Sequence, residues 1–112
     1  MEKPIVKPGQ IWVRRGSQTA RLEIEAVREQ RVIDGQTIYL VYERTFDTGQ
    51  PSGRRGGAQS RSLVGVNDAH ELCWASGSTE RTSTVTADEW AGAPRQMQAR
   101  GRYSNVVYEP GS

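Results

Sequence analysis

Two long β-prone segments joined by a two-residue turn constrain the fold of this chain more than any other feature. Over residues 20–27, apolar side chains alternate with charged ones, which is the pattern of a strand with one buried face. The segment continues to Ile33 and meets Asp34-Gly35, a dipeptide that favours tight hairpins because both residues tolerate positive φ. The return segment, 37–45, is apolar on both faces. These features predict a long antiparallel hairpin whose second strand is covered on both sides.

Short apolar runs elsewhere add further strands to this hairpin. Residues 11–13, 63–66 and 106–108 are each typical of a short strand bounded by turn residues. Four to six such strands, joined partly by hairpins, predict a mainly β chain. We expect a small SH3-like β-barrel or a curved antiparallel sheet, with one or two short helical turns.

Two capping-box spacings locate the expected helical turns. Asp68 stands three residues before Glu71, which predicts a short helix through Trp74. Thr86 stands three residues before Glu89, which predicts a helical turn over residues 87–91. Gly92 and Pro94 are expected to end this second turn.

The length of 112 residues fits one domain, 1–112, with one core. Apolar residues make up only 35% of the chain, so the core must rely on a few large side chains, chiefly the three tryptophans, Phe46 and the four tyrosines. Residues 47–62 are rich in glycine and arginine and offer no large apolar anchor, which predicts a long flexible loop. Residues 101–112 are expected to form a tail or a closing strand.

Several protein classes conflict with the composition. The longest apolar runs are a few residues, far below the roughly 20 that span a bilayer. Residues 1–6 lack the apolar core of a secretory signal. Cys73 is the only cysteine, which excludes an intramolecular disulfide and fits a reducing compartment. We therefore expect a cytoplasmic protein without membrane contact.

No group of residues predicts catalysis or a cofactor. His70 and Cys73 are three residues apart, and a Cys-His pair is a nucleophilic arrangement in some hydrolases. With one histidine and one cysteine there is no soft-ligand set for zinc, and beside Leu72 and Trp74 the thiol is expected to be packed. The glycine-rich stretch lacks the Gly-Lys-Ser/Thr ending of a P-loop. We expect no enzyme activity, no metal and no cofactor.

The segment Lys7-Pro8-Gly9-Gln10-Ile11-Trp12-Val13 resembles the opening of short SH3-like barrel proteins encoded by bacteriophages and prophages. Those proteins commonly begin with Pro-Gly-Gln-x-Trp and end in a β run that leads into a capped turn bearing an aromatic residue, which residues 84–90 match in type. The resemblance covers about half the chain. The insertion over residues 47–77 and the tail beyond Arg95 depart from that pattern, and added segments of this kind often carry the specific function.

Arginine and tyrosine supply the candidate binding residues. There are 13 arginines and two lysines, which fits either phosphate contacts or a GC-rich coding genome. Arginines on a sheet can instead form cross-strand ion pairs, and tyrosines can instead pack in the core. The candidate phosphate contacts are Arg14, Arg15, Arg54, Arg55 and Arg61. The candidate exposed aromatics are Tyr39, Tyr103 and Tyr108.

These features favour a non-catalytic accessory protein of a phage or other mobile element that binds a host macromolecule. The expected partner is a host protein or protein complex, as for an anti-defence or anti-CRISPR inhibitor. DNA mimicry is disfavoured because the net charge is +2. The alternatives are a DNA- or RNA-binding barrel that uses its arginine-rich loop, an enzyme assembled from several barrels, and a virion connector. The sequence leaves the oligomeric state open.

Overall fold

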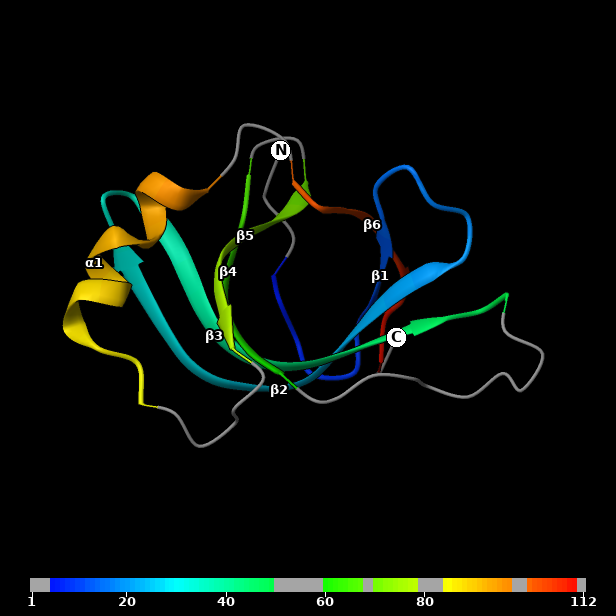
Figure 1. Cartoon of the computed structure of the whole chain (residues 1–112), viewed down its shortest axis with the longest axis horizontal. Coiled ribbons are helices and arrows are strands. Elements are labelled where there is room, and N and C mark those ends of the chain that lie inside the picture. Colours follow the sequence, from blue (N-terminus) through cyan, green and yellow to red (C-terminus); the bar gives the residue numbers. More distant parts are fainter. Residues whose placement is uncertain (1–4, 50–59, 68–69, 79–83, 98–100, 111–112) are drawn as a thin grey trace.

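A computed structural model describes residues 5–49, 60–67, 70–78, 84–97 and 101–110. Six antiparallel strands close into a barrel in which neighbours in sequence are neighbours in space, and the last strand pairs with the first (Figure 1). The expectation of a mainly β chain that forms a small barrel is confirmed. The elements in chain order are β1 (Ile11–Arg14), β2 (Ala20–Ile33), β3 (Gln36–Asp47), β4 (Ser60–Val66), β5 (Glu71–Ser78), α1 (Ala87–Gln96) and β6 (Tyr103–Tyr108).

The predicted hairpin is the longest structure in the barrel. β2 and β3 pair from Ala20 and Asp47 at the open end to Ile33 and Gln36 at the turn. Asp34 and the glycine after it have φ of 50° and 76°, as a tight hairpin turn requires. Two register shifts interrupt the β2 side, and such bulges bend a strand. The hairpin therefore curves along one side of the barrel, from β1 to α1 (Figure 1).

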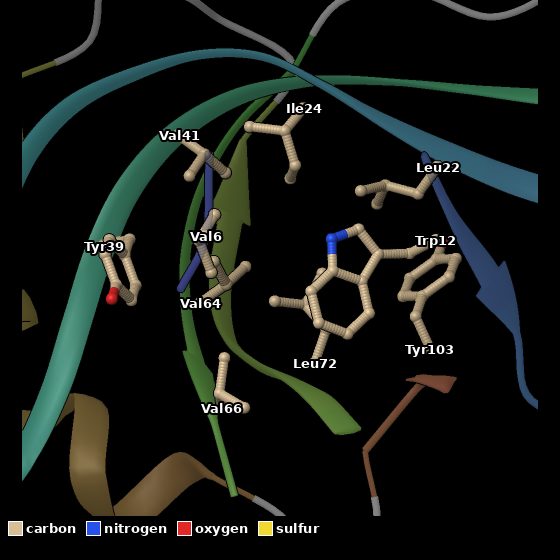
Figure 2. Packing of buried hydrophobic residues seen from close by; sticks show 10 residues of the cluster. All are labelled: Val6, Trp12, Leu22, Ile24, Tyr39, Val41, Val64, Val66, Leu72 and Tyr103. Atoms are coloured by element: carbon tan, nitrogen blue, oxygen red, sulfur yellow. The ribbon is translucent and has the colours of Figure 1, made fainter. Parts of the chain in front are cut away.

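The barrel interior is filled by apolar side chains from all six strands. Trp12 is fully buried and lies among the others in Figure 2. Val6, from the segment before β1, adds to the same cluster. The remaining members are Leu22, Ile24, Tyr39, Val41, Val64, Val66, Leu72 and Tyr103.

The helix α1 covers part of the outer face of the barrel. Trp90 and Ala93 are buried against a second apolar cluster that includes Ile38 and Leu63. The predicted capping box is present, since the Thr86 side chain accepts from the backbone of Glu89 and the Glu89 side chain accepts in return.

The predicted end of this helix is wrong, because α1 continues through Gly92 and Pro94 to Gln96. Proline inside a helix removes one backbone hydrogen bond. Burial of Trp90 and Ala93 on the outer cluster outweighs the loss of that hydrogen bond. This burial depends on tertiary packing, so Gly92 and Pro94 alone do not predict where the helix ends.

The helix predicted from Asp68 to Trp74 is also wrong, since residues 71–74 are part of β5. The side chain of Asn67 accepts from the backbone N–H of Glu71, and the backbone N–H of His70 donates to the carbonyl of Asn67. These hydrogen bonds join the residue after β4 to the start of β5, and β5 gains a ladder of hydrogen bonds to β4. Asp68 lies outside the described residues.

Closure of the barrel rests on a narrow contact between β5 and β6. Only Glu71 with Ser104 and Leu72 with Tyr103 are paired. The buried carboxylate of Glu71 strengthens this contact by accepting hydrogen bonds from Arg15, from the Asn67 side chain and from the backbone N–H of Gly101. Glu71 thereby links three segments that strand pairing alone joins weakly.

A second buried polar side chain holds the opposite part of the barrel. Gln10 is fully buried, and its amide oxygen accepts from the backbone of Lys7 and from the indole of Trp12. Gly9 has φ of 89°, and a Cβ there would lie 2.9 Å from Pro110 Cγ. The Pro-Gly-Gln-x-Trp opening is therefore explained by packing of the barrel ends.

The loop expected over residues 47–62 is shorter at both ends in the structure. Asp47 is the last residue of β3, and β4 begins at Ser60. Arg61 and Ser62 are buried strand residues. Strand pairing between β3 and β4 orders these polar residues, although their composition is that of a loop. Residues 50–59 lie outside the described residues.

Candidate binding site

Two of the predicted binding residues form a pair where β1 ends and β6 begins. Arg14 is the register partner of Tyr103. The Tyr103 hydroxyl has a raised pKa because it is buried, and the adjacent Arg14 guanidinium opposes this through its charge and a hydrogen bond. Arg14 itself is exposed. The pair therefore presents a cation at the surface directly above a buried phenol.

Two other predicted binding residues, Arg15 and Arg61, form ion pairs within the chain. Arg15 binds the carboxylate of Glu71. Arg61 is only 6% exposed, and its Nη2 lies 3.5 Å from Glu89 Oε2 in the first turn of α1. The prediction that Arg61 lies in an exposed loop is wrong, because pairing with β3 and β5 places it on the outer face of β4, beside α1. Arg54 and Arg55 lie outside the described residues.

Two of the three candidate tyrosines were assigned to the wrong side of their strands. Tyr39 is 6% exposed and Tyr103 is 4% exposed, and both belong to the barrel interior (Figure 2). Both faces of β3 are covered, since Ile38 packs under α1 while Tyr39 points inward. Tyr108, by contrast, is 54% exposed.

Sequence reasoning missed Arg102 and Trp74, which lie beside the Arg14 and Tyr103 pair. The backbone N–H of Arg15 donates to the carbonyl of Arg102 over 2.7 Å. The guanidinium carbon of Arg102 lies 5.5 Å from the centroid of the Trp74 ring, a cation–π distance. The ring of Trp74 is 6.0 Å from that of Tyr103, at 45°. The two-residue spacing of Leu72 and Trp74 is the signal that could have placed both on one strand face.

The buried carboxyl group of Glu43 also influences the pKa of the Tyr103 hydroxyl. Glu43 of β3 is 4% exposed, and its charge further raises the pKa of Tyr103. Burial raises the pKa of Glu43 from 4.5 to about 7; repulsion by Glu25 adds to the shift, while the Ser60 and Ser62 hydroxyls oppose it. Within the described part of the chain, Oε2 of Glu43 and Oγ of the fully buried Ser62 lack a well-formed hydrogen bond. A perturbed pKa and unpaired buried polar atoms are typical of functional sites.

We call this group the barrel-end site. It combines two exposed cations, two aromatic rings, a buried carboxyl and a buried hydroxyl from five strands and the residue preceding β6. Its members are Arg14, Glu43, Ser62, Trp74, Arg102 and Tyr103.

A second surface, which we call the terminal patch, consists of Ile5, Val107 and Tyr108. Their exposed fractions are 59%, 54% and 54%. The side-chain amide of Gln10 binds the carbonyl of Ile5 and the carboxylate of Glu109, so the two ends of the described chain lie side by side. Large exposed apolar side chains in neighbouring segments are candidates for an interaction surface.

The described residues contain no group of three or more His, Cys, Asp or Glu side chains that could hold a metal ion. Cys73 is buried as expected. The helical turn that would join it to His70 is replaced by β5.

Neither a protein-family model, nor a curated protein, nor a solved structure matches this chain. Among the residues placed in the structure, no helix is long and apolar enough to cross a membrane.

Proposed function

We propose that this chain is a non-catalytic accessory protein of a phage or other mobile element, and that it binds a host protein through the terminal patch. In this proposal it acts as an anti-defence or anti-CRISPR inhibitor does, by occupying a surface of a host complex. The observation that carries the proposal is the exposure of Ile5, Val107 and Tyr108, which lie in the two segments that the Gln10 amide joins.

The chemistry of the patch favours a protein partner. Tyrosine and large apolar side chains dominate the binding energy of protein interfaces, since they bury much area with few rotatable bonds. Tyr108 is the register partner of Ile11, so Val107 and Tyr108 lie on a strand that is paired with β1 and already ordered, while Ile5 lies in the segment before β1. A preorganised surface loses little conformational entropy on binding. Lys7 and Glu109 are exposed and would supply a polar rim.

Crosslinking from a single position tests this proposal. A photoreactive phenylalanine analogue replaces Tyr108 in the full chain, which is then irradiated in host lysate. Val32 is the matched control position, because it is 68% exposed and lies on β2, outside the terminal patch. We expect one host protein to be crosslinked from position 108 and not from position 32.

A competition experiment completes the test. Unlabelled wild-type chain should abolish the crosslink, and the Val107→Ser/Tyr108→Ala variant should compete at least about tenfold less well, since each lost apolar anchor removes about 1–2 kcal/mol. The Val32→Ser chain should compete as well as the wild type. Equal competition by all three chains would refute the patch as the binding surface.

A further inference from the structure

The barrel-end site carries positive charge that the described structure does not neutralise. Arg15 is matched by the carboxylate of Glu71. Arg14 and Arg102 are both exposed, and neither forms an ion pair with a carboxylate among the described residues. The backbone link from Arg15 to Arg102 keeps the two strand ends together. An anionic ligand group could bind two guanidinium groups here, one from the end of β1 and one from the residue preceding β6.

The aromatic part of the site fits a planar ligand group. Trp74 is partly exposed, and the guanidinium of Arg102 already lies over its ring. Trp12 and Trp90 are buried, with exposed fractions of 0% and 2%. Trp74 is therefore the tryptophan that a ligand can reach. Aromatic rings next to arginine are a recurrent platform for nucleobases, because every base has a π-face.

The buried polar atoms of the site add a reason to expect a ligand with hydrogen-bonding edges. Glu43 and Ser62 are at least nine-tenths buried, and neither Oε2 of Glu43 nor Oγ of Ser62 makes a well-formed hydrogen bond among the described residues. Buried polar groups of this kind are normally satisfied by protein, by water or by a ligand. A nucleobase offers both donors and acceptors along its edge.

We infer that the barrel-end site binds a nucleoside phosphate, with its phosphate on Arg14 and Arg102, its base against Trp74 and the base edge toward Glu43 and Ser62. Such a group comes either as a free nucleotide or as part of a single-stranded nucleic acid. An acidic peptide would satisfy the two arginines but would use neither the ring nor the buried polar atoms. The inference is independent of the terminal patch, which lies at the other end of β6 from Tyr103.

Intrinsic tryptophan fluorescence and anisotropy test the inference on the full chain. The probes are the four common nucleoside monophosphates, a fluorescein-labelled ten-nucleotide single strand and a labelled polyglutamate peptide of equal charge, each at low and at physiological salt. We expect quenching of Trp74 fluorescence by the nucleotide or the strand, and weakening as salt rises. Tighter binding of the strand would identify nucleic acid as the source, whereas equal affinities would identify the free nucleotide.

Matched variants decide whether this site is responsible. Arg14→Ala/Arg102→Ala should bind at least tenfold more weakly and lower the slope of log affinity against log salt. Arg28→Ala is the control, since Arg28 is also exposed and also lies over an aromatic ring, that of Tyr42, at 5.6 Å. Three outcomes would each overturn the inference. They are polyglutamate binding as tight as that of the strand, an equal loss of affinity in Arg14→Ala/Arg102→Ala and in Arg28→Ala, and no binding of nucleotide or strand at low salt.

Discussion

The side-chain amide of Gln10 donates to the carboxylate of Glu109 over 2.9 Å, a hydrogen bond between residues 99 positions apart in sequence. The same amide nitrogen donates to the carbonyl of Ile5 at 2.7 Å, and the amide oxygen accepts from the indole of Trp12 at 3.2 Å. One buried side chain thus joins the segment before β1, the core tryptophan and the segment after β6.

Replacing Gln10 should destabilise the barrel strongly. Gln10→Ala leaves the indole N–H of Trp12 buried without its partner, and an unpaired buried donor costs about 1–3 kcal/mol beyond the bonds lost. We expect a loss of about 2–4 kcal/mol in the free energy of unfolding, measured by urea denaturation. Gln30→Ala, at an exposed position of β2, should change it by less than about 0.5 kcal/mol. A similar effect of both substitutions would contradict the proposed role of Gln10.

The pKa of Glu43 predicts stability that falls as the pH rises. The folded pKa is about 7 against 4.5 for the free side chain, so between these values the folded chain holds a proton that the unfolded chain has released. The contribution of Glu43 is fully present below pH 4.5 and is lost as the pH rises through 7. Glu43→Gln should remove this dependence and make the chain about 1–3 kcal/mol more stable relative to wild type at pH 8 than at pH 4.5.

The measurement for Glu43 is the free energy of unfolding of wild type and variant at half-unit intervals from pH 4.5 to 8. Glu29→Gln serves as the control, because Glu29 is exposed and its ion pair with Arg31 lies on the surface. Its stability curve should run parallel to that of the wild type. A constant difference between Glu43→Gln and wild type across this pH range would show that the Glu43 carboxyl does not titrate there.

Two glycines should respond oppositely to the same substitution. A Cβ at Gly101 would lie 2.9 Å from the carbonyl oxygen of Leu72 and would clash with the Cβ of Glu71, where β5 meets β6. Gly101→Ala should cost about 1–3 kcal/mol through overpacking. Gly92 lies inside α1, where an added Cβ meets only the Gln96 amide at 3.8 Å, so Gly92→Ala should stabilise by about 0.5–1 kcal/mol. Thermal unfolding of both variants checks the opposite signs.

The two acidic residues in the first turn of α1 should differ in importance. Glu89 completes the capping box and is the only described carboxylate paired with the buried Arg61. Nε and Nη1 of Arg61 already lack partners, so Glu89→Ala leaves the cation without an ion pair among the described residues. We expect a loss of about 2–4 kcal/mol. Asp88→Ala, at an exposed position, should cost less than about 1 kcal/mol, since only its favourable position near the helix N-terminus is lost. Equal losses in urea denaturation would contradict this difference.

The candidate site could be predicted from the sequence only in part. Arg14 and Tyr103 were both proposed, but their pairing depends on the antiparallel register of β1 and β6, which no local signal specifies. Trp74 is missed because residues 68–74 are expected to form a helix, and Arg102 is missed because it lies at the start of the segment 101–112, which is expected to be a tail or a closing strand. Glu43 has no unusual sequence context, and its role arises from burial on a strand whose two faces are both covered.

The sequence by itself determined the features that depend on near neighbours. These are the β2–β3 hairpin with its Asp34-Gly35 turn, the capped start of α1 at Thr86 and the mainly β character of the chain. Hydrophobic alternation, turn residues and helix caps each depend on residues close together in sequence, so they can be recognised without knowing the tertiary structure. Only the tertiary structure decided that Arg15 and Arg61 serve internal ion pairs, that Tyr39 points inward and that β5 is a strand. These outcomes depend on which segments pair and which faces are covered when the barrel closes, and that depends on partners distant in sequence.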